Sequence, residues 1–315
     1  MILRALTAMA APAGPRSRLS VFYFHRTLAE PDPLLPDEPD ARMFDRILGW
    51  IGAQFRVLDP LEACERLYDG TLPSRPAVIT FDDGYRDNYT VALPILQRHR
   101  MGAAFFIATG FLDGGMMFND RVIEAVRKAA GDSLAIPGTA DRLPIRDLAE
   151  RRIAIERILR AVKHLPPDER HSRVLELEHG LGQTGRSEMM MEPGLVARLH
   201  GAGMRVGGHT RTHPILLALN DEESLAEIVN GADDIAAIVG TSPDLFAYPN
   251  GRLGSDFDDR HARMVASAGF RFAFTTHAGV ADRSSAAMML PRFTPWDRSP
   301  LRFRVRALRN VARAA

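Results

Sequence analysis

The chain has 315 residues, of which 46% are hydrophobic and 25% are charged, and its formal net charge is +1. This is the composition of a globular protein with a large core, built as one big α/β domain or two smaller ones. The balanced charge gives no reason to expect nucleic acid as a partner. The single cysteine, Cys64, excludes an internal disulfide framework and fits a reducing compartment.

The first residues contain a mostly apolar run, 5–11, which Pro12 interrupts. The run is shorter and richer in alanine than a secretory signal usually is, which favours an uncleaved N-terminus and a cytoplasmic protein. No apolar stretch in the chain is long enough to predict a membrane-spanning helix.

Short apolar runs predict buried strands. They lie at 19–24, 77–81, 103–108, 204–207, 245–248, 270–275 and, more weakly, 289–293. Helix-length segments lie between many of them, at 41–54, 60–68, 89–99, 222–239 and 258–268. Strands that alternate with helices predict a parallel sheet or barrel. About seven strands over this length suit a (β/α) barrel, whose active-site residues lie at the C-terminal strand ends.

Residues 114–192 interrupt this alternation. Asn119 is expected to cap a helix at 120–130, and apolar periodicity predicts another at 147–164. Pro166-Pro167 and the glycine-containing stretch 180–185 punctuate the segment. We interpret it as a helical insertion packed on the barrel. It either borders the active-site cleft or is structural bulk, and bulk is the favoured reading.

The last segment, 300–314, is predicted to be a helix with Ser299 as its N-cap. An apolar stripe runs beside an arginine stripe along it: Leu301, Val305, Leu308 and Ala312, and Arg302, Arg306, Arg309 and Arg313. A solvated basic face is the favoured interpretation because the apolar stripe is narrow. The alternative is peripheral attachment to an anionic membrane or another partner.

Two motifs supply the chemistry. Asp82 and Asp83 follow a predicted strand and precede Gly84, and His209 and His213 follow another strand, four residues apart. One carboxylate and two imidazoles are a common ligand set for a catalytic divalent metal with a position open for water. The second carboxylate is then free to act as a base. The other histidines lie on polar helical stretches and are expected to be solvated: His99, His164, His171, His179, His200 and His261.

These motifs resemble those of the polysaccharide deacetylases that share the NodB-like domain. Residues 80–84 match the family's first motif and 209–214 its second; 246–251 resemble its third. Residues 269–274, followed by 290–292, resemble a common bacterial branch. The resemblance implies a distorted (β/α)7 barrel over 19–298, with the insertion at about 114–192 and a basic C-terminal helix at 299–315.

The resemblance also implies roles. Asp83, His209 and His213 would bind zinc or a similar divalent ion, and Asp82 would be the general base. The backbone N–H of Asn250 would stabilise the oxyanion. The family's third motif often opens with an arginine that orients the base, but Ala247 stands there, so Arg292 is the candidate instead. The general acid would be His25, at the end of the first strand; His277 is a poorer match.

The expected function is therefore metal-dependent removal of N-acetyl groups from the amino sugars of a glycan or glycan precursor. Tyr85, Tyr248 and Trp296 join Asn250 as candidates for contact with the substrate or oxyanion. Three alternatives share the fold: an O-acetyl esterase, a metal-independent cyclic-amide hydrolase and a non-catalytic glycan-binding module. The intact metal ligands argue against the last two, although Ala247 keeps the binding module open.

Overall fold

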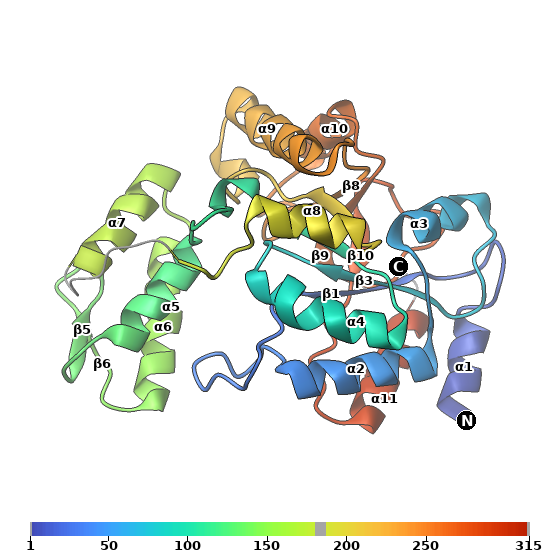
Figure 1. Cartoon of the computed structure of the whole chain (residues 1–315), viewed down its shortest axis with the longest axis horizontal. Coiled ribbons are helices and arrows are strands. Elements are labelled where there is room, and N and C mark those ends of the chain that lie inside the picture. Colours follow the sequence, from blue (N-terminus) through green and yellow to red (C-terminus); the bar gives the residue numbers. More distant parts are fainter. Residues whose placement is uncertain (1, 180–186, 314–315) are drawn as a thin grey trace.

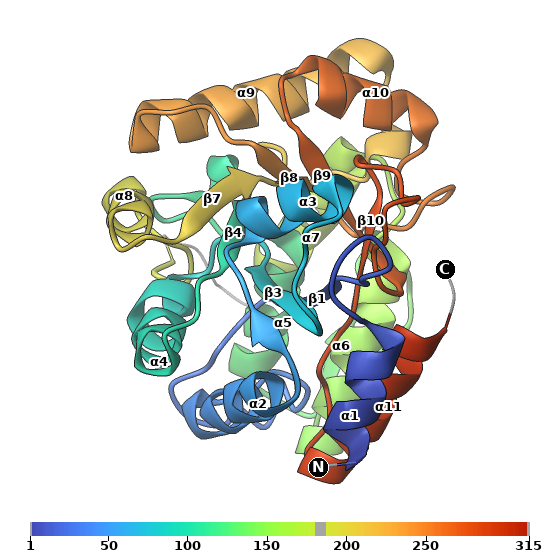
Figure 2. The same ribbon diagram turned by 90° about the vertical axis from the view of Figure 1, so that its right-hand side faces the viewer.

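The computed structural model describes residues 2–179 and 187–313. Its centre is a parallel sheet that curls into a barrel with helices around it (Figure 1, Figure 2). Along the sheet, the strands are β1 (Ser20–Phe24), β3 (Pro76–Phe81), β4 (Ala104–Ile107), β7 (Arg205–Gly208), β8 (Leu245–Ala247), β9 (Phe272–Ala278) and β10 (Leu290–Arg292). A bridge between Phe22 and Phe293 joins the first strand to the last and nearly closes the barrel. The predicted α/β barrel is confirmed.

The strands lie where the apolar runs predict them, because parallel strands are covered on both faces. All six residues of β3 are buried, as are all four of β4. A further short strand, β2 (Arg56–Val57), pairs with the start of β3. The parallel direction brings the C-terminal ends of all the barrel strands to one rim.

The surrounding helices are α2 (Ala41–Gln54), α3 (Pro60–Asp69), α4 (Leu93–His99), α8 (Pro193–Gly201), α9 (Asp221–Val239) and α10 (Asp259–Ser267), with short 3-10 turns at Thr109–Phe111 and Leu216–Ala218. The helix predicted at 89–99 is divided: a π-helical turn, Asn88–Ala92, precedes α4. Pro94 lies at the start of α4 and has no N–H with which to continue a regular helical ladder.

The insertion is a separate helical layer beside the barrel, with its own apolar core (Figure 1). It comprises α5 (Phe118–Lys128), α6 (Leu148–Val162), α7 (Pro167–His179) and an antiparallel pair, β5 (Ser133–Ala135) and β6 (Arg142–Pro144). That strand pair was not predicted, since three-residue strands show too little alternation. Asn119 does not cap α5. The helix begins at Phe118, so Met117 occupies the cap position and Asn119 lies inside the first turn. The predicted break at 180–185 lies outside the described residues.

The terminal helices α1 (Ile2–Ala10) and α11 (Pro300–Ala312) pack side by side (Figure 2). Ser299 caps α11, as predicted. The predicted apolar stripe is wrong: α11 buries Phe303, Ala307 and Val311, whereas Leu301 is 64% exposed. The large Phe303 ring packs against Phe22 and Trp50 and so decides which face turns inward. Among the described residues no helix is long and apolar enough to cross a membrane.

Two histidines differ from the expectation that they are solvated. His261 is completely buried at the start of α10, where its Nδ1 accepts the Asp258 N–H in a capping box. His99 lies 2.9 Å from Asp45 and is largely buried. Helical polarity alone does not identify such local hydrogen-bond partners. Cys64, by contrast, is buried in α3 as inert packing, and burial raises the pKa of its thiol.

Candidate active site

The candidate catalytic residues converge at the C-terminal rim of the barrel. His25 follows β1, the two aspartates follow β3, and His209 follows β7. Asp83 adopts a left-handed φ of 76° and Gly84 a φ of 94°. This sharp turn, uncommon for a residue with a side chain, lets the two adjacent carboxylates diverge.

Three side chains could hold a metal ion: Asp83, His209 and His213 have ligand atoms within 4.8 Å of one another. Asp83 Oδ1 lies 3.3 Å from His209 Nε2 and 3.5 Å from His213 Nε2. Asp83 Oδ1 is buried and has no hydrogen-bond partner among the described residues, as expected of an atom that faces a cation. Two imidazole nitrogens and one carboxylate oxygen fit zinc with an open position.

The protonation of the histidines suits this role. His209 Nδ1 lies 2.7 Å from the Ala247 carbonyl oxygen, which can only accept, so Nδ1 carries a proton and Nε2 is the nitrogen that faces Asp83. Burial lowers the pKa of His213 to about 3, which keeps that imidazole neutral. The ligand segment is a turn in which Thr210 and His213 have positive φ values, and Thr210 Oγ1 accepts the His213 N–H at 3.1 Å. Ala247 thus takes part through its backbone.

Asp82 forms a buried two-pronged ion pair with Arg292. The guanidinium donates to the two carboxylate oxygens at 2.7 and 2.8 Å, and the side chains are 2% and 0% exposed. Arg292 also donates to the Thr275 carbonyl at 2.9 Å and lies 4.4 Å above the Tyr23 ring. Burial alone would raise the pKa of Asp82, but Arg292 and His209 together hold it below its usual value. The carboxylate is therefore ionised.

His25 lines the same cavity as the metal-ligand triad. Burial disfavours its charged form, but the carboxylates of Asp83, Asp82 and Glu38 outweigh burial and raise the pKa of His25. The imidazole is thereby biased toward the protonated form that a general acid needs. His277 is exposed on a different part of the surface, in a separate pocket.

The cavity has a volume of about 470 Å³, and the insertion forms one of its walls. The wall residues are Met117, Phe118, Asn119, Leu159 and Lys163. The structure therefore supports the reading that the insertion borders the cleft.

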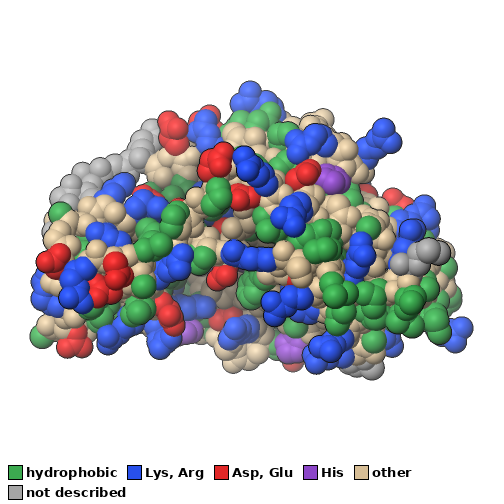
Figure 3. All heavy atoms as spheres, turned by 90° about the horizontal axis from the view of Figure 1, so that it is seen from below, with side chains coloured by type: hydrophobic (Ala, Val, Ile, Leu, Met, Phe, Trp, Pro, Cys, Tyr) green, Lys and Arg blue, Asp and Glu red, His purple; other side chains and the backbone are tan. Residues whose placement is uncertain are grey.

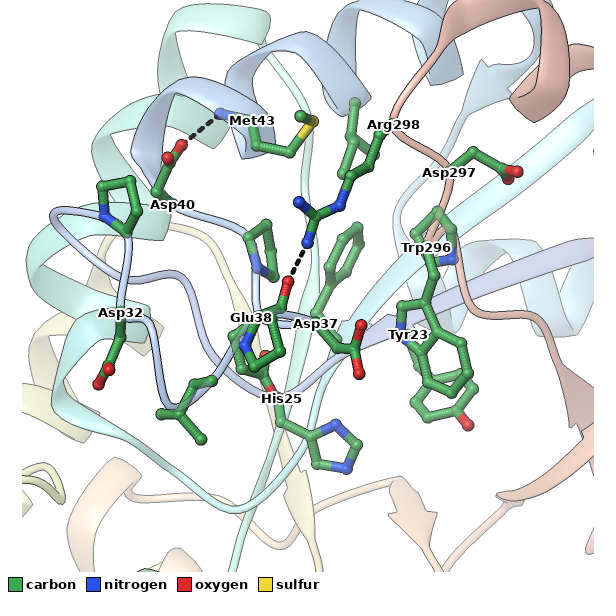
Figure 4. A pocket seen from close by; sticks show the side chains of 17 residues that line it. Tyr23, His25, Asp32, Asp37, Glu38, Asp40, Met43, Trp296, Asp297 and Arg298 are labelled. Atoms are coloured by element: carbon green, nitrogen blue, oxygen red, sulfur yellow. Dashed lines mark hydrogen bonds between the residues drawn. The ribbon is translucent and has the colours of Figure 1, made fainter. Parts of the chain in front are cut away.

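A neighbouring pocket of about 300 Å³ shares Tyr23, His25 and Trp296 with this cavity. Figure 4 shows this pocket, with Asp37 and Glu38 beside His25. Trp296 is 67% exposed at the boundary.

The remaining candidates divide between rim and core. Asn250 lines the cavity with a φ of 58°, and its carbonyl accepts the Thr276 hydroxyl at 2.6 Å. Tyr248 is 0% exposed and stacks on Phe257 at 3.8 Å, away from the cavity. Tyr85 is also buried, and its hydroxyl donates to Asp120 at 3.0 Å. These two tyrosines are not among the residues that line the cavity.

Sequence reasoning missed several cavity residues. Tyr23 could have been found, because it stands on β1 two residues before His25, which directly follows that strand, and so shares its face. Arg252 and Asp256 follow the third motif, and the Arg252 N–H donates to Asp256 at 2.9 Å. Lys163, from the insertion, had no local signal.

Comparisons with known proteins identify the family to which the chain belongs. A family model described as polysaccharide deacetylase matches residues 69–136 and 176–273, more than half of the chain. The Bacillus subtilis protein YxkH, named for the same family, is 39% identical over 66 residues, which are 20% of this chain and 24% of YxkH. The match thus spans about a quarter of that relative.

Solved structures share the fold. The deacetylase PplD of Streptococcus pyogenes, in complex with acetate, aligns with a TM-score of 0.60 at 18% identity and covers 93% of this chain and 98% of its own. IcaB from Ammonifex degensii aligns with a TM-score of 0.58 at 17% identity, and the alignment covers 96% of this chain and 99% of IcaB. A de-N-acetylase from Aggregatibacter actinomycetemcomitans aligns with a TM-score of 0.55 at 15% identity, and the alignment covers 88% of this chain and 94% of that protein. Because the family model matches more than half of the chain, the chain belongs to the polysaccharide deacetylase family.

Proposed function

We propose that this chain is a metal-dependent hydrolase that removes N-acetyl groups from the amino sugars of a glycan or glycan precursor. The observation that carries the proposal is the convergence of the triad Asp83, His209 and His213 with Asp82 and His25 in one cavity. Membership of the family supports a carbohydrate substrate. The nitrogen-rich ligand set favours zinc.

A divalent cation held by the triad would polarise the acetyl carbonyl and make a coordinated water more acidic. Asp82, ionised and oriented by Arg292, would accept a proton as the water oxygen bonds to the carbonyl carbon. The Asn250 N–H would donate to the carbonyl oxygen as it gains charge. His25 would then donate its proton to the amide nitrogen as the carbon–nitrogen bond breaks. The products are acetate and a free amino sugar.

The proposal also assigns roles to the barrel, the insertion and the rim of the cavity. Residues 19–298 would form the catalytic unit, with the insertion as a wall that contacts the sugar chain, and Trp296 would offer an aromatic surface at the rim. A cytoplasmic site of action is supported by the lone, buried Cys64. A glycan precursor rather than a mature polymer fits that location.

Acetate release from N-acetylglucosamine oligomers tests the function. The purified chain should contain about one zinc ion, lose activity with a chelator and regain it with added zinc. His209→Ala should lower metal occupancy and abolish turnover, while His171→Ala, on the insertion, should leave both unchanged. Full activity of the metal-free chain would rule out the mechanism. Release from O-acetylated sugars alone would instead identify an esterase, and binding without release a glycan-binding module.

A further inference from the structure

The two terminal helices form a basic surface that the proposed chemistry does not use. Residues 2–18 and 299–313 contain eight of the chain's 40 Lys and Arg residues and none of its 39 Asp and Glu residues. This concentration is unusual in a chain whose net charge is only +1. Within the described residues, no carboxylate lies at ion-pair distance from Arg4, Arg302, Arg309 or Arg313, all of which are exposed.

Apolar side chains stand exposed on the same helices. Ile2, Leu6 and Met9 are 77%, 42% and 78% exposed, and their spacing places them on one face of α1. The opposite face carries the buried Thr7, whose hydroxyl accepts from the Gln54 amide. Leu301, at the start of α11, adds a further exposed apolar side chain. Viewed from the side on which α1 and α11 lie, hydrophobic side chains gather at that end of the molecule among arginines (Figure 3).

We propose that this α1–α11 surface binds the surface of an anionic lipid bilayer. An amphipathic helix that lies in the interface buries its apolar side chains at the acyl boundary, while arginines contact lipid phosphates. A nucleic acid or an acidic protein would satisfy the arginines but leave Ile2, Leu6 and Met9 in water. The surface of an anionic bilayer can pair its phosphates with the arginines and bury the apolar side chains as well. We therefore infer that the partner is a bilayer.

The surface contains nothing that the catalytic proposal needs, so the two stand separately. Figure 3 also shows a hollow between the insertion and the barrel on the same face. The pocket that shares Tyr23, His25 and Trp296 with the active-site cavity adjoins the start of α11, because Trp296, Asp297 and Arg298 line it and Ser299 caps that helix. A chain docked through α1 and α11 would therefore hold its substrate-binding region close to the lipid headgroups, where the sugar of a lipid-linked precursor lies.

Cosedimentation of the full chain with vesicles tests the proposal. We expect binding to vesicles of equal parts phosphatidylglycerol and phosphatidylcholine, none to phosphatidylcholine alone, and weaker binding as salt increases. The double variant Ile2→Ser with Met9→Ser should lose at least about tenfold in affinity, because two apolar side chains no longer leave water. Arg302→Gln with Arg309→Gln should lose on the order of tenfold or more.

Matched controls carry the same changes elsewhere. Leu225→Ser on α9 and Arg263→Gln on α10 alter exposed residues away from the terminal helices and should bind like the unchanged chain. Acetate release from a small water-soluble oligomer, without vesicles, should be equal in all variants, so loss of binding is distinguishable from loss of catalysis. Absence of binding to the anionic vesicles, equal binding by every variant, or capture of nucleic acid in preference to vesicles would overturn the proposal.

Discussion

Asp82 and Asp83 are neighbours in sequence but face different surroundings. Asp83 Oδ1 faces two imidazoles, while both oxygens of Asp82 are held by the Arg292 guanidinium. The left-handed turn at Asp83 separates the two carboxylates. Environment, not residue type, therefore divides the proposed roles of ligand and base between them.

Asp82→Asn should keep the bound metal and lose activity by about a hundred- to ten-thousand-fold, since the amide cannot accept the proton. Zinc content by atomic emission and kcat for acetate release, measured on the same preparation, check this. The His209→Ala variant serves as the reference for metal loss. If Asp82→Asn releases the metal, the roles of the two aspartates are reversed.

His25→Ala should damage amide hydrolysis severely and the hydrolysis of an activated ester much less. An amine leaves poorly unless its nitrogen is protonated, whereas a nitrophenolate leaves without help. Rates on an N-acetylated oligosaccharide and on p-nitrophenyl acetate give the comparison, with His277→Ala as the control. Equal losses on both substrates, or an undiminished amide rate, would remove His25 from the acid role.

The pH dependence follows from the directions of the two pKa shifts. Asp82 titrates below its ordinary 3.8, so the base stays ionised throughout the neutral range and is lost only at lower pH. His25 titrates above its ordinary 6.5, so the acid stays protonated past that pH and is lost as the pH rises further. We expect kcat/KM for an amide to fall on an alkaline limb above 6.5 that is absent for an activated ester. An alkaline limb shared by both substrates would contradict this assignment.

At the scale of elements, the insertion is tied to the barrel's first loop. Arg127 on α5 pairs with Asp32 at 2.6 Å, and the Arg152 guanidinium on α6 donates to the Pro33 carbonyl at 2.8 Å. The same loop carries Glu38 beside His25. The insertion thus both forms a cavity wall and anchors the loop opposite it.

Leu159→Ala, in this wall, should raise KM for an N-acetylated oligosaccharide severalfold and leave the hydrolysis of p-nitrophenyl acetate unchanged. The larger substrate would extend to the insertion, whereas the small ester would need only the rim of the barrel. Ile153→Ala is the matched control, because it lies on the same helix and is 56% exposed. Equal KM values for Leu159→Ala and the unchanged chain would mean that the wall is structural bulk.

At the scale of the whole molecule, α11 is part of the barrel and not an appendage. Its Phe303 shares one core with Phe22 of β1 and Trp50 of α2, with ring centroids 5.9 and 6.0 Å apart. That packing closes the side of the barrel where β1 meets β10. It also holds α1 in place, since the two terminal helices pack together.

Phe303→Ala should lower the free energy of unfolding by about 3–5 kcal/mol, the usual range for removing a fully buried ring. Urea unfolding followed by circular dichroism measures it. Leu301→Ala, at an exposed position of the same helix, should change stability by less than about 0.5 kcal/mol. A small loss in Phe303→Ala would show that α11 docks on a barrel that is complete without it.

The local patterns of the sequence determined much of this protein. Apolar runs located the seven strands that follow one another around the barrel, Ser299 marked the start of α11, and the two motifs named residues that share one rim. Each signal depends on neighbours along the chain, where periodicity and hydrogen-bonding capacity can be read directly. The Asp82–Arg292 contact was reached only through the family resemblance, because no local signal joins residues so far apart.

Tertiary structure decided the rest. Periodicity indicates which side chains share a face but not which face meets the core, so the wrong stripe of α11 was chosen, the burial of His261 was missed, and Tyr248 was expected to contact the substrate although it does not line the cavity. The insertion contributes side chains to the cavity because it docks as a separate layer beside the barrel. Packing between segments that are distant in sequence determines that docking. The sequence by itself therefore determined the barrel and its chemical groups, and only the folded chain determined which side chains surround the place where the substrate is expected to bind.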